Sequence, residues 1–330
     1  MQRRHTIMGW STTLLTVSLS ASVSCYTATF DDEASGVFAC IEDSECQDGF
    51  ICWNNSCEDD RGPAITVLGP EPLSVFDSGT AQLEIAIRGE DLTLSNNFDD
   101  AVDGEGYLEV LIDGVAVRSQ ADGTAITEGD LSDGFTIGAV DIPDPTLVNH
   151  RIEVRAYRGD GSRYENPSGT GRQIFFVRDP LVLSLGTKPM MAITRPWPGS
   201  KLRRGRPVVV ELAAVDFTWT NPTGEVSPMD FKEGHAHIFF DRDDYPACLP
   251  GCNGLYVDTL RPANSVETGD PRFLRVNDLE HKEDQPAGEF IVSAGLQRNN
   301  HAACPSVDPT REDFVLEQAV ADNVVVELVD

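Results

Sequence analysis

Basic residues are scarce in this 330-residue chain. It has 25 Lys and Arg against 54 Asp and Glu, which gives a formal net charge of -29. A chain this negative repels the phosphates of nucleic acids and the anionic headgroups of lipids, so nucleic-acid binding is excluded as a main role. The charge fits a solvated, salt-tolerant surface, and binding of Ca²⁺ or another cation is the more specific alternative.

Catalytic motifs are also missing. The sequence contains no G-x-S-x-G, H-E-x-x-H, Walker or dinucleotide-binding pattern. The acidic segment from Asp99 to Glu105 has a superficial likeness to a calcium loop, but Ala101 stands where an EF-hand loop has a ligand. We interpret this segment as a solvated turn, and we expect a non-catalytic protein.

Long hydrophobic runs are confined to the N-terminus. Arg3 and Arg4 precede an apolar stretch over residues 7–23, and small residues then lead to Cys25. This order is typical of a signal peptide, here residues 1–24. No later run reaches the roughly 18 apolar residues that a membrane-spanning helix needs, so we expect none in the mature chain.

The end of the signal peptide carries a further pattern. Val23-Ser24-Cys25 resembles the end of the lipobox of bacterial lipoproteins, although Ser22 stands where an aliphatic residue is usual. The resemblance implies that Cys25 is lipidated and that the chain is held at the cell envelope, at the outer membrane, by lipid alone. Cleavage by the ordinary signal peptidase and full secretion is the alternative, and either route exports the chain.

Export permits disulfide bonds, and residues 25–61 are interpreted as a tether followed by a four-cysteine module. Its cysteines follow the spacing C-x5-C-x5-C-x4-C in a segment too short to build a hydrophobic core: Cys40, Cys46, Cys52 and Cys57. Zinc is the competing interpretation, but it prefers closer pairs. Four cysteines allow three pairings, of which we favour Cys40–Cys52 with Cys46–Cys57. The run from Cys40 to Cys52 resembles the dickkopf-N-like cysteine motif behind the lipobox of many surface lipoproteins in some Gram-negative bacteria, which implies an extracytoplasmic spacer.

From Pro63 onward the chain has the pattern of β-structure. Alternating runs such as residues 82–87 and 151–156 are separated by Gly, Pro and Asp-Gly turns. Pro63, Pro70 and Gly79 recur in the same order as Pro189, Pro196 and Gly205, and residues 106–113 recur as 234–241. We predict an all-β fold of two homologous β-sandwich domains, 62–180 and 188–330, joined by residues 181–187. Their openings, residues 65–70 and 192–196, resemble the immunoglobulin-like domains of bacterial surface proteins.

The repeated strand 234–241 differs from its first copy by two histidines. In the first copy Leu108, Val110 and Ile112 form the core face, and in the second Ala236, Ile238 and Phe240 do so. His235 and His237 are then side by side on the outer face, where two imidazoles can reach one Zn or Cu ion. The further ligands on offer are His281, His301, Asp241, Asp243 and Asp244. Solvated surface histidines are the alternative, and the strand is similar to His-rich strands of small exported domains of unknown function.

The turn after this strand also differs between the copies. Asp113-Gly114 predicts a tight type I′ hairpin in the first copy, whereas the second has a long segment with Cys248 and Cys252. With Cys304 the remaining cysteines are odd in number, so either Cys248 pairs with Cys252 or Cys304 takes one of them. Loops on rigid sandwiches commonly carry binding, which makes a protein or glycan ligand at the cell surface the expected partner. A stapled insertion without a ligand is the alternative.

Overall fold

The computed structural model describes residue 40 and residues 43–77, 79–178, 189–221, 233–240, 256–266, 268–279, 287–298 and 321–329. Within these ranges the regular structure consists of β-strands and three short 3₁₀ helices: η1 (Asp43–Glu45), η2 (Pro167–Gly169) and η3 (Pro262–Asn264). The prediction of an all-β chain is confirmed. No helix in this part of the chain is long and apolar enough to cross a bilayer.

The four-cysteine segment forms a small stapled hairpin. β1 (Phe50–Trp53) pairs antiparallel with β2 (Ser56–Asp59), and both Asn54 and Asn55 at the turn have positive φ angles, of 51° and 61°. Disulfide bonds join Cys40 to Cys52 and Cys46 to Cys57, the favoured pairing. Because a hairpin of this length is marginal on its own in water, the two cross-links supply the constraint that a core provides elsewhere.

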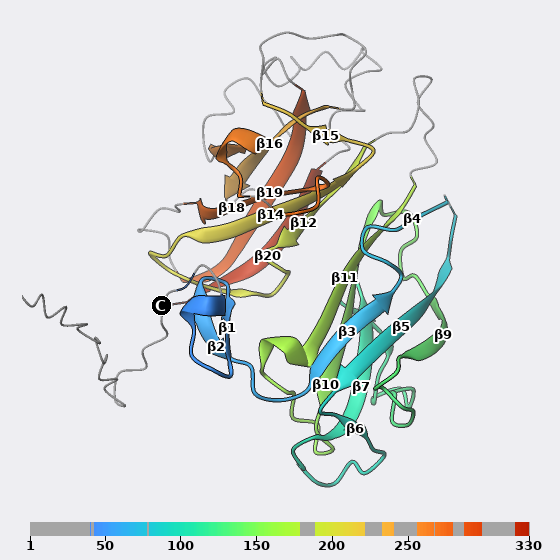
Figure 1. Cartoon of the computed structure of the whole chain (residues 1–330). Coiled ribbons are helices and arrows are strands. Elements are labelled where there is room, and N and C mark those ends of the chain that lie inside the picture. The colour runs from blue at the N-terminus through green and yellow to red at the C-terminus, as the bar shows by residue number, and fades with distance from the viewer. Residues whose placement is uncertain are drawn as a thin grey trace, which may run out of the picture. The chain divides into compact units, whose positions relative to one another are not determined.

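The first sandwich contains two sheets (Figure 1), and all their strand pairs are antiparallel except β4 with β11 and β6 with β7, which are parallel. One has the order β3-β5-β9, and the other has the order β4-β11-β10-β7-β6 with β8 paired to β7. The strand bounds are β3 (Ala64–Gly69), β4 (Val75–Phe76), β5 (Gln82–Glu90), β6 (Thr93–Leu94), β7 (Glu105–Ile112), β8 (Val115–Arg118), β9 (Phe135–Asp141), β10 (Asn149–Tyr157) and β11 (Thr170–Val177).

The second sandwich repeats this topology. Its sheets have the orders β12-β14-β18 and β13-β20-β19-β16-β15, with β17 paired to β16. The strand bounds are β12 (Met190–Arg195), β13 (Lys201–Arg203), β14 (Val208–Val215), β15 (Thr218–Trp219), β16 (Glu233–Phe240), β17 (Tyr256–Leu260), β18 (Phe273–Leu279), β19 (Gly288–Arg298) and β20 (Ala321–Val329).

The matching strand orders confirm the internal repeat. Local features recur as well: β3 and β12 each have a register shift in their pairing with β5 and β14, and Asp91 and Asp216 adopt left-handed backbone angles, with φ of 56° and 57°. In each copy the first, third and seventh strands form one sheet, and the other six strands form the second sheet. This is the arrangement of an immunoglobulin-like sandwich.

The cores follow the predicted alternation. Leu108, Val110 and Ile112 lie in the core of the first sandwich, and Ala236, Ile238 and Phe240 lie in the core of the second. Each set comes from one face of a central strand, so every second residue is removed from water. The predicted hairpin is also present, since Asp113 and Gly114 have φ angles of 52° and 77°, as a type I′ turn requires.

Candidate functional site

The two histidines of the second sandwich lie close enough to share a ligand. β16 is paired with β17 on one side and with β19 on the other, and His235 and His237 project from the same face of it. Their Nε2 atoms are 3.2 Å apart. Two imidazole nitrogens bound to one tetrahedral Zn²⁺ at about 2.0–2.1 Å each would be separated by roughly 3.3–3.4 Å. The two rings form a hydrogen bond with each other through these atoms, and the spacing is also close to that of two ligands of one Zn²⁺.

This face is less open than the sequence indicates. His235 is completely buried, with 0% of its surface exposed, whereas His237 is half-buried. The expectation of an outer, solvated position is wrong for His235. Alternation correctly assigns the face opposite the core, but a strand in the middle of a sheet can be covered on both faces by other parts of the chain.

The remaining predicted ligands and thiols lie outside the described ranges. This applies to Cys25, Asp241, Asp243, Asp244, Cys248, Cys252, His281, His301 and Cys304. Among the residues that the structure describes, the group of metal-ligating side chains found together is Cys40, Cys46 and Cys57, whose sulfurs are in disulfide bonds. A third ligand for His235 and His237, and the pairing of the last three cysteines, remain predictions.

The acidic segment of the first sandwich lies in a turn. Asp99, Asp100 and Asp103 are exposed, and Asp103 accepts a hydrogen bond from Arg158 Nε at 3.0 Å. One carboxylate thus points to a guanidinium from another part of the domain. This arrangement fits the interpretation of the segment as a solvated turn.

A second region of interest is the joint between the two sandwiches. The face of β10 and β11 that points away from the first core is covered by the start of the second sandwich. Ile174 and Phe176 of β11 pack there with Leu73 and with residues of the second copy: Met190, Ala192, Trp197 and Ala213. All seven are buried. The outer sheet face of the first domain is therefore the docking surface for the second.

Polar contacts cross the same joint. The Arg151 guanidinium donates to the carboxylate of Asp322 in β20, and it also donates to the carbonyl oxygen of Ile193 at 3.2 Å. Trp197 Nε1 donates to the carboxylate of Glu153, which is also held by Arg155 at 2.6 Å. Buried charged groups arranged in this way specify one docking geometry, because a shifted interface leaves them unpaired.

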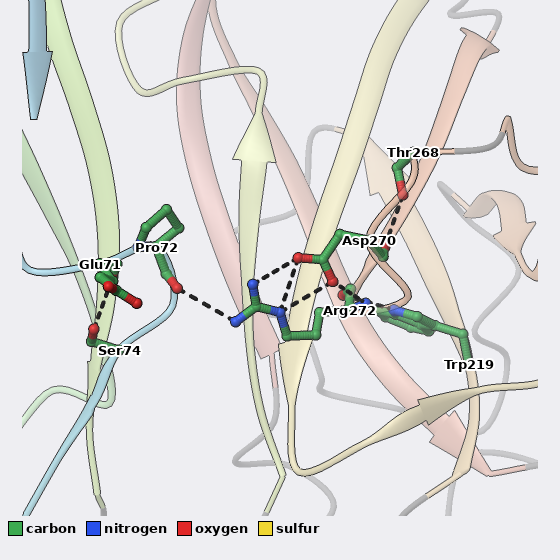
Figure 2. Close-up of polar contacts among 7 residues, drawn as sticks. All are labelled: Glu71, Pro72, Ser74, Trp219, Thr268, Asp270 and Arg272. Carbon is green, nitrogen blue, oxygen red and sulfur yellow. Dashed lines mark hydrogen bonds and ion pairs between the residues drawn. The ribbon is translucent and has the colours of Figure 1, made fainter. Parts of the chain in front are cut away.

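A further contact lies at the edge of the joint (Figure 2). Both carboxylate oxygens of Asp270 accept hydrogen bonds from Arg272, which hold the pKa of Asp270 below its usual 3.8. The same guanidinium donates through Nη1 to the carbonyl oxygen of Pro72 at 3.5 Å, and Trp219 Nε1 donates to the carbonyl oxygen of Arg272 at 3.0 Å. Arg272 thus links the second sandwich to the loop before β4.

The stapled module is attached to both sandwiches. Asp60, just after β2, accepts hydrogen bonds from the backbone N–H and hydroxyl of Ser168 at 2.8 and 2.7 Å. Asn55 Nδ2 donates to the carbonyl oxygen of Pro207 in the second sandwich. The Trp53 ring has the Arg172 guanidinium 4.7 Å and the Arg195 guanidinium 5.8 Å from its centroid. The module therefore has fixed partners in each copy.

Comparisons with known proteins add little beyond this geometry. No protein-family model matches the sequence, and no curated protein matches it. Among solved structures, the fibronectin(III)-like modules of Clostridium thermocellum CbhA are 11% identical, with 80% of this chain and 92% of that chain covered and a TM-score of 0.23. Titin domains z1z2, solved with telethonin, are 14% identical, with 81% and 95% covered and a TM-score of 0.18.

A third solved structure is a tetra-tandem repeat from the extending region of a large adhesion protein. It is 10% identical, with 81% of this chain and 49% of that chain covered and a TM-score of 0.23. Similarity this low carries no conclusion about function. The immunoglobulin-like assignment rests on the strand order and register of each sandwich.

Proposed function

We propose that the chain is an exported cell-envelope lipoprotein with a non-catalytic binding or adhesion role, anchored through a lipidated Cys25. The observation that carries the proposal is the stapled module attached to two joined immunoglobulin-like sandwiches. Disulfides persist in oxidising compartments outside the cytosol, which supports export. A fixed joint keeps the loops of the two copies at a constant spacing, as a binding surface requires.

Replacing Cys25 with Ser tests the anchor. In a Gram-negative host we expect wild-type protein in the membrane fraction, and at least a tenfold lower membrane share for Cys25→Ser, because a serine cannot carry the thioether-linked lipid. The matched control is Ser24→Ala, which keeps a small residue beside an intact Cys25. A wild-type chain found in the cytosol, or a serine variant that stays with the membrane, would contradict the proposal.

A second candidate function is metal binding at His235 and His237. The distance of 3.2 Å between their Nε2 atoms favours it, because that spacing suits two ligands of one ion. The ion proposed is Zn²⁺ or Cu²⁺, since neutral imidazole is a good ligand for both. His281 and His301 are proposed as further ligands.

Calorimetric titration of Zn²⁺ and Cu²⁺ into the mature protein tests this candidate. We expect one ion per chain, and at least tenfold weaker binding for His235→Ala/His237→Ala. Affinity should also fall as the pH is lowered, because the metal binds neutral imidazole and protons compete for the same nitrogens. The double variant His235→Gln/His237→Gln controls for the side-chain volume that alanine removes. His281→Ala and His301→Ala test whether these two residues are further ligands. Indistinguishable wild-type and double-variant curves remove the metal site.

A further inference from the structure

A cavity lies where the stapled module meets the two sandwiches. Its volume is about 370 Å³, near the lower end of the range for small-molecule sites. The module contributes Trp53, the first sandwich Arg172 and Gln173, and the second sandwich Arg195 and Trp197. Because all three parts of the chain form its wall, the cavity exists only when the joint is assembled.

Positive charge gathers at this cavity. Burial lowers the pKa of Arg172 to about 10, an effect that Glu153 partly opposes and that the nearby Arg163, Arg155 and Arg195 add to. The Arg172 guanidinium is still protonated at neutral pH. A local excess of guanidinium groups is unexpected in a chain with 54 acidic and 25 basic residues. Like charges at close range repel one another, so a nearby anion is favoured.

The cations of the wall have few partners of their own. Arg172 donates through Nη1 to the carbonyl oxygens of Pro167 and Thr170 at 3.3 and 3.4 Å, while its buried Nε has no hydrogen-bond partner in the described part of the chain. Neither Arg172 nor Arg195 forms an ion pair with a described carboxylate. Glu153 is engaged by Arg155 and Trp197. The charges of these two guanidinium groups are thus not neutralised by a described carboxylate.

The rest of the wall suits a ring rather than a bare ion. Both guanidinium groups lie over the half-buried indole ring of Trp53, and Ile65 and Leu73 add apolar surface to the wall. Thr66, an exposed residue, also lines the cavity, and its hydroxyl can donate or accept a hydrogen bond. Guanidinium groups bind carboxylates through charge-assisted hydrogen bonds, and apolar surface packs against the C–H face of a sugar ring.

We propose that this cavity binds a uronic-acid unit of an acidic glycan, with its carboxylate on Arg172 and Arg195 and its ring against the apolar wall of Ile65 and Leu73. The inference deepens the proposed binding role, on which it rests. The overall negative charge of the chain does not prevent it, since unpaired exposed charges are screened beyond about 8 Å at physiological salt. Binding should weaken as salt rises, because part of the affinity is electrostatic.

Calorimetric titration of the mature chain carrying Cys25→Ser, in 0.15 M NaCl, tests the proposal with digalacturonate as the probe. The methyl-esterified disaccharide is the matched neutral ligand, which tests whether the carboxylates are needed. Sodium sulfate tests whether any small anion binds equally well. We expect digalacturonate to bind at least tenfold more tightly than either. Arg195→Gln should weaken digalacturonate binding at least tenfold, about 1.4 kcal/mol. Among the described residues the Arg195 side chain donates no hydrogen bond, so the fold should persist in this variant; Arg172→Gln should act in the same direction.

Arg118→Gln is the matched control, because it removes one guanidinium of the first sandwich that does not line the cavity. We expect its affinity to remain within twofold of wild type. The proposal is overturned if digalacturonate fails to bind at millimolar concentration, if the methyl ester or sulfate binds equally well, or if Arg195→Gln has no more effect than Arg118→Gln. None of these results bears on the anchor, which the Cys25 fractionation tests separately.

Discussion

Asp322→Ala is expected to lower the free energy of unfolding by about 3–5 kcal/mol, the usual cost of removing one partner of a buried ion pair. The side chains of Arg151 and Asp322 are only 12% and 6% exposed. The Asp322 carboxylate also accepts the backbone N–H of Ile193 at 2.7 Å. The substitution therefore leaves a buried guanidinium charge and a backbone donor without their acceptor at the joint. Urea unfolding followed by circular dichroism measures the loss.

An exposed ion pair supplies the control for this prediction. Asp103 accepts from Arg158 at 3.0 Å, but its side chain is 89% exposed. Asp103→Ala should cost less than about 1 kcal/mol, because water screens the pair. If Asp322→Ala costs no more than Asp103→Ala, the joint is not held by this contact. If the two sandwiches of Asp322→Ala unfold in separate steps, the pair couples them.

Removal of the disulfide between Cys46 and Cys57 is expected to have the second largest effect, on the module itself. In Cys46→Ser/Cys57→Ser, the free energy of local opening of residues 43–59 should fall by about 2–5 kcal/mol, because the unfolded segment gains conformational freedom. Amide hydrogen exchange resolves this segment from the sandwiches. Since the module forms one wall of the cavity through Trp53, digalacturonate binding should weaken in the same variant.

Ser44→Ala is the control within the module. Ser44 is exposed in η1, and its loss should change stability by less than about 0.5 kcal/mol. If the amides of residues 43–59 are equally protected from hydrogen exchange in the wild type and in Cys46→Ser/Cys57→Ser, the disulfide does not hold the hairpin.

Several features of the fold could be predicted from local pattern. Alternation identified the core faces of β7 and β16, and the ordered recurrence of Pro70 as Pro196 identified the repeat. The shortness of the four-cysteine segment and its wide cysteine spacing favoured disulfides over zinc, and the favoured pairing is the one observed. These features depend on residues near one another in the sequence or on a strict period of two, which sterics impose on every strand.

The joint and the cavity could not be predicted in this way. Glu153 meets Trp197, and Trp53 meets Arg172 and Arg195, only because separate units pack together. One local signal was present: β11 contains the run Ile174-Phe175-Phe176-Val177, which is apolar on both faces. A strand of that kind indicates that both faces of its sheet are covered. The burial of His235 likewise depends on tertiary packing that alternation does not report.

Mass spectrometry of the mature N-terminus, on native protein taken from the membrane fraction, tests the proposed function most directly. We expect an N-terminal peptide that begins at Cys25 and carries diacylglyceryl and acyl groups on that residue. An unmodified Cys25, a start at another residue, or a cytosolic chain that retains Met1 would contradict an envelope lipoprotein.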